Sequence, residues 1–132
     1  MVFRMFADMK AYLFVFVGGG LGSLVRYMAG RLIPPMLGTN PFPTAILLVN
    51  VLASAVLGLV VGWGLSRSAS EDARLLIGVG FCGGLSTFSS FSNDTAILLQ
   101  QDRTGTALLN IVLNVGLCLL ASFGGLSVGQ KL

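Results

Sequence analysis

The residues best suited to chemistry gather in one short stretch, residues 83–92, which reads GGLSTFSSFS. It holds two glycines, five hydroxyl residues and two phenylalanines, and it interrupts a long apolar run. Hydroxyl groups both donate and accept hydrogen bonds. Irregular backbone at membrane depth is tolerated only where it is buried in protein or lines a watery path. The stretch therefore predicts a broken membrane helix at a binding or permeation site.

A packing face is the simpler alternative for the same stretch. Small residues often line helix–helix contacts in membranes, and composition alone favours that interpretation. Phe88 and Phe91 argue against it. They are three residues apart and would lie on one side of a helix, where two bulky rings prevent close approach. We therefore favour a site.

Two other segments supply polar side chains in apolar surroundings. Asn50 offers two N–H donors in the middle of one run. In the last run, polar side chains recur every four residues and so share one helix face: Asn110, Asn114, Cys118 and Ser122. Such a stripe must face protein or water. It is either interhelical hydrogen bonding or part of a polar track through the bilayer, and the track accounts for more of the pattern.

A track of this kind has a definite charge preference. Amide N–H groups and hydroxyls supply hydrogen-bond donors, and no ring of carboxylates is present to attract cations, so the lining suits a small anion. The edges of phenyl rings carry the positive side of the ring quadrupole and add to that preference.

The elements that position these residues follow from composition. The chain has 132 residues, of which 55% are hydrophobic and 10% charged, and its mean hydropathy is +0.89. These values indicate an all-α integral membrane protein. Because a bilayer crossing takes about 20 helical residues, we expect a single four-helix membrane domain, residues 1–132, with spans at about 11–32, 44–65, 75–100 and 107–128, the third broken mid-membrane.

Composition also argues against several function classes. Histidine is absent and only five carboxylates are present, which removes most routes to acid–base catalysis and most metal sites, so we do not expect an enzyme. Lysine and arginine are scattered, so no nucleic-acid partner is expected. Cys82 and Cys118 fall in apolar segments and are interpreted as small buried residues. Gly58 and Gly62 predict a helix-packing face.

One charged residue, Arg26, lies inside or at the edge of the first span. A charge there is costly and usually faces the protein interior, marks function, or extends to the interface. Arg31 lies one turn further on, so extension to the interface is an equally good explanation.

Three parts of the chain together resemble the bacterial fluoride channels of the Fluc (CrcB) family: residues 83–92, the glycine-rich segment ending in Arg26 and Tyr27, and residues 42–50. The resemblance spans nearly the whole chain in the right order, and residues 87–92, TFSSFS, resemble the phenylalanine box of that family most specifically. It implies four-helix subunits, inserted antiparallel as a dual-topology homodimer in the lipid of the bacterial inner membrane. Two fluoride pores would run along the subunit interface.

The resemblance also implies roles for single residues. Phe88 and Phe91 would be the box phenylalanines and Asn50 a pore amide. The other expected pore residues are Ser89, Ser92, Asn114, Cys118 and Ser122. A structural sodium ion would lie at the dimer centre, held by the main-chain carbonyls of Gly83 and Ser86, because a broken helix frees acceptors for a hard cation. Arg26 is assigned a structural role.

The chain departs from the family pattern at several positions. Ala45 and Ile46 stand where Gly-Thr is usual, Cys118 where a hydroxyl is common, Asn114 where residues vary, and Asp94 in place of a glutamate. Our leading hypothesis is a passive, fluoride-selective channel that exports cytoplasmic fluoride and lowers its toxicity. The alternatives are a small proton-coupled multidrug exporter, which needs a membrane carboxylate such as Asp94, and a non-transporting membrane scaffold subunit. Positive residues flank both ends of the expected bundle without a strong bias, which is compatible with insertion in both orientations.

Overall fold

The computed structural model describes residues 2–35, 41–66 and 70–132. Within those residues, four segments are helical, long and apolar enough to cross a membrane. Three are single helices: α1 (Val2–Leu32), α2 (Thr44–Ser66) and α6 (Thr104–Gly129). The other segment runs through α3 (Glu71–Ala73), the π-helical η1 (Arg74–Cys82), α4 (Gly83–Leu85) and α5 (Phe88–Gln100).

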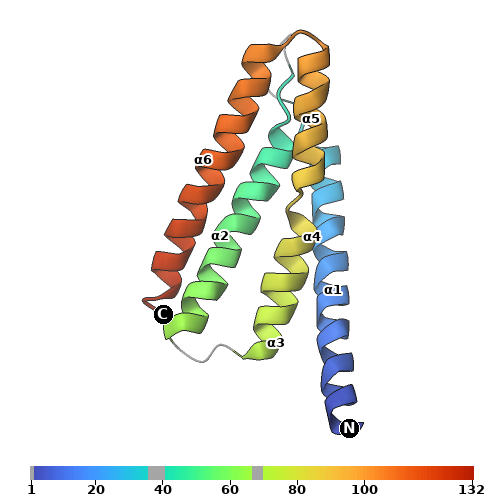
Figure 1. Ribbon diagram of the computed structural model, residues 1–132, viewed down its shortest axis with the longest axis vertical. Helices are drawn as coiled ribbons and strands as arrows, with labels where there is room; N and C mark the ends of the chain where they lie inside the picture. The colour runs from blue at the N-terminus through green and yellow to red at the C-terminus, as the bar shows by residue number, and fades with distance from the viewer. Residues whose placement is uncertain (1, 36–40, 67–69) are drawn as a thin grey trace.

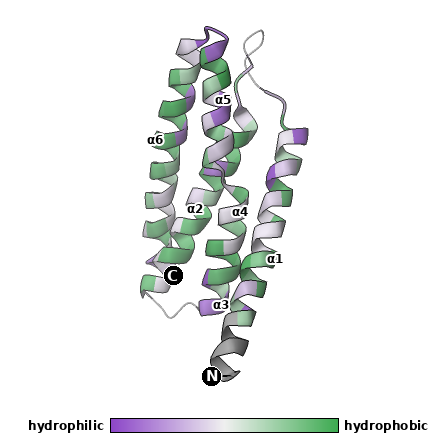
Figure 2. Cartoon of the chain, turned by 45° about the vertical axis from the view of Figure 1, so that its right-hand side comes forward, coloured by the Kyte–Doolittle hydropathy of each residue, from purple (hydrophilic) through white to green (hydrophobic). Residues whose placement is uncertain are grey.

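The four segments lie side by side in an elongated bundle (Figure 1). α2 packs along α6, whereas α1 packs against η1 and α4. α5 continues the third segment toward the far end of the bundle, where it contacts α6. Both chain termini lie at the same end, as an even number of crossings requires. Most of the helix surface is hydrophobic, and hydrophilic residues gather mainly toward helix ends and loops (Figure 2).

Glycine allows α2 and α6 to approach closely. Gly58 lies against the main-chain carbonyl of Ser122, and a Cβ added to it would collide with that oxygen. Gly62 of α2, and Gly125 and Gly129 of α6, are equally close to the backbone of the facing helix. Lipid tails are as apolar as the helix surfaces, so the hydrophobic effect does not drive helices together in a membrane. Small residues instead allow close van der Waals packing between them. The packing face predicted at Gly58 and Gly62 is therefore confirmed.

A compact apolar cluster joins α2 to the third segment. Val49 and Ala53 of α2 pack with Cys82 and Leu85, and all four side chains are buried. Leu85 is fully buried at the end of α4. Cys82 thus behaves as the small buried residue that the sequence predicts. The cluster anchors the backbone directly before the polar stretch.

Between α4 and α5 the backbone leaves the helical conformation for two residues. Ser86 (φ −76°, ψ 154°) and Thr87 (φ −153°, ψ 116°) are extended. The Thr87 hydroxyl accepts a hydrogen bond from the Ser90 N–H at 3.2 Å and so caps the N-terminus of α5. The Ser86 hydroxyl donates back to the Cys82 carbonyl at 2.9 Å. Local hydrogen bonds of this kind are what Ser and Thr offer in place of helix continuation.

The helices extend beyond the ranges expected from hydropathy. α1 begins at Val2 instead of near residue 11, since no proline or glycine precedes Gly18. α3 begins at Glu71 because Ser70 caps it, accepting from the Ala73 N–H at 3.2 Å. Hydropathy detects the part of a helix that suits lipid, and these additional turns are more polar.

Candidate functional site

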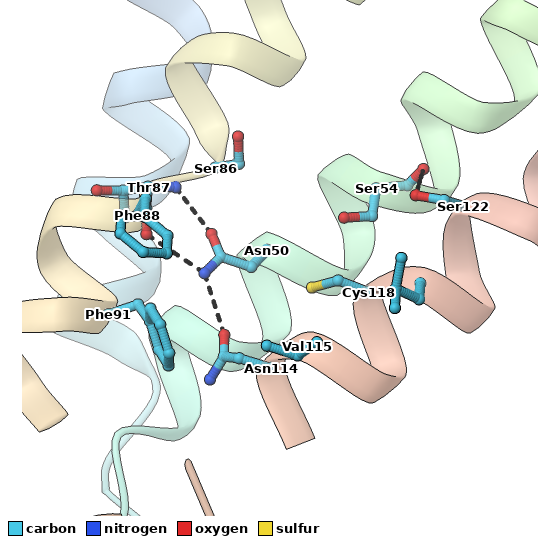
Figure 3. A pocket seen from close by; sticks show the side chains of 11 residues that line it. Asn50, Ser54, Ser86, Thr87, Phe88, Phe91, Asn114, Val115, Cys118 and Ser122 are labelled. Atoms are coloured by element: carbon cyan, nitrogen blue, oxygen red, sulfur yellow. Dashed lines mark hydrogen bonds between the residues drawn. The ribbon is translucent and has the colours of Figure 1, made fainter. Parts of the chain in front are cut away.

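An open pocket of about 380 Å³ lies where α2, α6 and the start of α5 meet (Figure 3). It brings together most of the expected pore residues, namely Asn50, Phe88, Phe91, Asn114, Cys118 and Ser122. Ser86, expected to act through its carbonyl, also lines it. These residues come from three helices and are up to 72 positions apart in the chain, from Asn50 to Ser122. The pocket is therefore a product of the tertiary fold.

Asn50 is the centre of the hydrogen bonding in this pocket. Its Oδ1 accepts the main-chain N–H of Thr87 at 2.8 Å. Its Nδ2 donates to Oδ1 of Asn114 at 3.1 Å and, more weakly, to the Thr87 carbonyl at 3.4 Å. One buried amide from α2 therefore connects the beginning of α5 to α6 (Figure 3).

The polar stripe on α6 divides into two parts. Asn110 and Asn114 are 1% and 5% exposed. Asn114 donates to Oδ1 of Asn110 at 2.9 Å, and Asn110 donates to the hydroxyl of Thr95 at 3.0 Å. Cys118 and Ser122 are partly exposed and line the pocket, so the prediction that Cys118 is a buried residue is wrong. The stripe therefore takes part in interhelical hydrogen bonding at its beginning and lines the pocket from Asn114 onward, and the polar track through the bilayer stays a prediction.

The two phenylalanines differ sharply in exposure. Their ring centroids are 5.5 Å apart and the ring planes are inclined by 56°. Phe91 is 8% exposed and packs inside the bundle, whereas Phe88 is 78% exposed in the single chain. Tilted rings present edges to their surroundings, which carry the positive side of the quadrupole. Both rings face the Asn50 side of the pocket (Figure 3).

Sequence analysis missed four lining residues. Thr87 contributes through its main-chain groups, which side-chain patterns do not reveal. Ser54, Val115 and Leu119 complete the wall. Ser54 follows Asn50 by four residues, so the same helical spacing that revealed the α6 stripe also places Ser54 on the Asn50 face. Its carbonyl accepts from the Ser122 hydroxyl at 3.5 Å.

Other expected site residues lie outside this pocket. Ser89 is exposed and shares a hydrogen bond with the Thr87 hydroxyl at 3.1 Å. Ser92 is partly buried on α5. Arg26 is partly buried on α1, and among the described residues no hydrogen-bond or ion-pair partner is found for it. None of the three lines the Asn50 pocket.

The helix interruption diverts two N–H donors from the carbonyls that a continuous helix would give them. The Thr87 N–H, which would pair with the Gly83 carbonyl, donates to Asn50 instead. The Ser90 N–H, which would pair with the Ser86 carbonyl, donates to the Thr87 hydroxyl. In the described ranges no group of three His, Cys, Asp or Glu residues is placed to hold a metal. Main-chain carbonyls at the interruption are oxygen ligands of the kind that a hard cation binds.

The chemistry of the pocket is that of hydrogen-bond donors. Two carboxamides, three serine hydroxyls and a threonine line it, and none of its lining residues is a carboxylate or a cation. Apolar side chains and ring edges form the remaining wall. A cavity of this composition favours a small anion over a cation.

The fold and this pocket together define a multi-pass α-helical membrane protein with a polar pocket among its spans. The model of the family "CrcB-like protein, Camphor Resistance (CrcB)" matches residues 13–126. The chain therefore belongs to the CrcB family.

Relatives are similar over nearly their full length. The chain is 40% identical over 124 residues to a protein from Shewanella denitrificans, covering 94% of this chain and 96% of that one. It is 41% identical over 127 residues to a protein from Pyrococcus furiosus, with 94% and 99% coverage. A third relative, from Novosphingobium aromaticivorans, is 40% identical over 121 residues, with 91% and 96% coverage. Each of these relatives is named "Fluoride-specific ion channel FluC".

Proposed function

We propose that the protein is a passive, fluoride-selective ion channel. The observation that carries this proposal is the Asn50 pocket, a cavity lined by amide and hydroxyl donors without a single carboxylate. Similarity to relatives named as fluoride-specific channels supports the same conclusion. In a bacterial inner membrane such a channel lets cytoplasmic fluoride leave down its electrochemical gradient and so lowers fluoride toxicity. It performs transport and no catalysis.

The pocket supplies hydrogen-bond donors that can replace the water a fluoride ion loses on entry. Fluoride is small and strongly hydrated, so donors must replace its water at little reorganisation cost. The Nδ2 group of Asn50 and the hydroxyl of Ser54 are such donors, and the Ser122 hydroxyl, whose bond to the Ser54 carbonyl is long at 3.5 Å, can join them by turning away from that carbonyl. The edges of Phe88 and Phe91 add a weakly positive surface that does not attract cations strongly. Larger anions are disfavoured because a narrow path lined by phenyl rings would hinder their passage.

We further propose that the channel is an antiparallel, dual-topology homodimer surrounded by lipid. In the single chain the pocket is open and Phe88 is 78% exposed beside it. A second copy in the opposite orientation would close the open side and give each of two pores a complete wall. The two extended residues between α4 and α5 would then lie mid-membrane at the subunit interface, where irregular backbone is tolerated.

A structural sodium ion at the dimer centre fits the residues present. The carbonyls of Gly83 and Ser86 are two of those whose helical N–H donors are used elsewhere. Such carbonyls would hold the ion, which would supply positive charge that joins the two subunits. Hard cations prefer oxygen ligands of this kind.

A proton-coupled exporter is less well supported. Asp94, the only carboxylate well inside an expected span, does not line the Asn50 pocket. It lines a separate cavity of about 240 Å³ near the α5–α6 turn, together with Arg103 and the segment that precedes α2. No observation favours a scaffold subunit without transport.

Liposomes test the proposed function directly. Purified protein is reconstituted into vesicles loaded with potassium fluoride, and valinomycin is added to carry potassium while an electrode follows released fluoride. Rapid fluoride efflux is expected, without efflux from matched vesicles loaded with potassium chloride. Folded, dimeric protein that releases neither ion would contradict the channel, and equal release of both ions would contradict its selectivity.

A further inference from the structure

A continuous series of side-chain hydrogen bonds begins and ends on the backbone of α5. The main-chain N–H of Thr87 donates to Asn50, Asn50 to Asn114, and Asn114 to Asn110. Asn110 then donates to Thr95, whose hydroxyl donates to the main-chain carbonyl of Phe91 at 2.8 Å. We call these five linked bonds the amide relay. It passes through α2 and α6 and returns to the helix where it began.

Its two ends, together with the Asn110 main-chain carbonyl that accepts from Nδ2 of Asn114 at 3.1 Å, fix the direction of every bond in the amide relay. A main-chain N–H can only donate, and a main-chain carbonyl can only accept. If the Asn50 amide were reversed, its Nδ2 would face the Thr87 N–H, and two donors would lack an acceptor. Leaving buried polar groups unpaired in this way is strongly unfavourable. Each carboxamide therefore has one stable orientation.

This orientation decides which end of Asn50 is available to an ion. Its oxygen accepts the Thr87 N–H at 2.8 Å, a short hydrogen bond that uses one of its two lone pairs. One of its N–H groups is used by Asn114, and the remaining N–H has only the Thr87 carbonyl at 3.4 Å, a long and weak hydrogen bond. The most loosely held polar group of Asn50 is thus a donor, and it is the group that Asn50 can most easily turn toward an ion in the pocket.

We propose that Asn110 and Thr95 are positioning residues that set the anion preference of the pocket through the amide relay. Neither side chain lines the pocket, and Asn110 is 1% and Thr95 8% exposed. They act by keeping Asn114 oriented with its oxygen toward Asn50, which keeps the Asn50 nitrogen available. The inference rests on the proposed channel function, because selectivity is the property that the amide relay controls.

Fluoride and chloride efflux from liposomes test this role. Thr95→Val keeps the shape of the side chain but removes the hydroxyl, and Asn110→Leu removes the amide. Each substitution should slow fluoride efflux about tenfold, because losing one oriented hydrogen-bond donor raises the free-energy barrier to fluoride passage. Each should also reduce the ratio of fluoride efflux to chloride efflux. Thr95→Ser restores the hydroxyl and should retain efflux within about twofold of wild type. Thr106→Val is the matched control, since Thr106 lies on α6 with no side-chain hydrogen bond to the described residues.

A double-mutant cycle separates positioning from simple support of the fold. If Thr95 acts through Asn50, Thr95→Val should slow efflux by less than about twofold in an Asn50→Ala background, because coupled residues are not additive. A full tenfold effect in that background would overturn the proposal. So would an unchanged fluoride-to-chloride ratio in folded Thr95→Val. The Thr95 variants decide the question even if Asn110→Leu does not fold.

Hydrogen exchange gives a measurement that does not depend on transport. Loss of the amide relay should speed exchange of the Thr87 main-chain N–H in Thr95→Val but not in Thr106→Val. Unchanged exchange in Thr95→Val, in protein whose wild type conducts fluoride, would overturn this inference alone. A wild-type protein that conducts no fluoride would overturn the proposed function and the ion-selecting role together.

Discussion

Helix α2 contacts its neighbours in two different ways. Along α6, α2 uses glycines that bring the backbones together: Gly58 and Gly62 lie against the backbone of α6, and Gly125 and Gly129 lie against the backbone of α2. Near the start of α5, the same helix uses a buried carboxamide, Asn50, which contacts its neighbours through hydrogen bonds. One contact excludes side chains and the other depends on them.

The difference explains where the pocket lies. A glycine contact leaves no space and no unused donor, because main-chain groups are satisfied within each helix. The carboxamide contact lies beside a cavity and places polar groups in its wall. The glycine contact therefore brings the helices together closely, and the polar contact lies beside a cavity lined by hydrogen-bonding groups.

Breaking the glycine contact should have the largest effect. In Gly125→Ala the new Cβ meets the carbonyl of Ala55, which cannot move without the helix. We expect destabilisation at the upper end of about 1–3 kcal/mol, measured as loss of the folded peak in size-exclusion chromatography and a lower Tm. Gly124→Ala, one residue away, meets nothing within 4 Å of the new Cβ and should be as stable as wild type. Equal stability of the two variants would contradict the close contact.

Substitutions of Phe88 and Phe91 test whether the two rings act through their positive edges or only through their volume. Phe88→Ile and Phe91→Ile should each slow fluoride efflux about tenfold, equivalent to about 1.4 kcal/mol, because an aliphatic chain has no positive edge. Phe91→Ile should also lower stability, by about 1 kcal/mol, since Phe91 is packed inside the subunit and only 8% exposed. Thermal melts and efflux measured on the same preparations separate the two effects. Wild-type efflux in both folded variants would exclude a role for the rings.

The smallest effect is expected at Asp94. It lines a cavity away from the Asn50 pocket, so Asp94→Asn should change passive fluoride efflux by less than about threefold, or about 0.7 kcal/mol. A proton-coupled exporter would lose its coupling group and stop. Complete loss of transport in folded Asp94→Asn, with proton-dependent transport in wild type, would favour the exporter.

Spacing within single helices predicted much of the site. The four-residue repeat on the last span placed Asn114, Cys118 and Ser122 on one face, and the structure brings that face to Asn50. Ser54 follows from the same spacing rule applied to Asn50. Hydropathy predicted four apolar segments, because lipid requires about 20 apolar residues in each crossing.

Main-chain roles and long-range pairings were beyond such patterns. No side-chain pattern indicates that the Thr87 N–H binds Asn50, because every residue but proline carries that group. The bond from Asn110 to Thr95 depends on how α5 and α6 pack, which spacing within one helix does not fix. The sequence also does not show which residues of the α6 stripe are buried between helices and which line the pocket.

Asn50 offers the most direct test of the central claim, that the polar contact of α2 is the ion path. Fluoride and chloride efflux are measured from liposomes holding wild type, Asn50→Ala or Asn93→Ala, each checked for folding. Asn93 is an exposed asparagine of α5 outside the pocket and provides the matched control. Wild type and Asn93→Ala should release fluoride rapidly and retain chloride, and Asn50→Ala should release fluoride at least about tenfold more slowly. Wild-type fluoride release by folded Asn50→Ala would contradict the account.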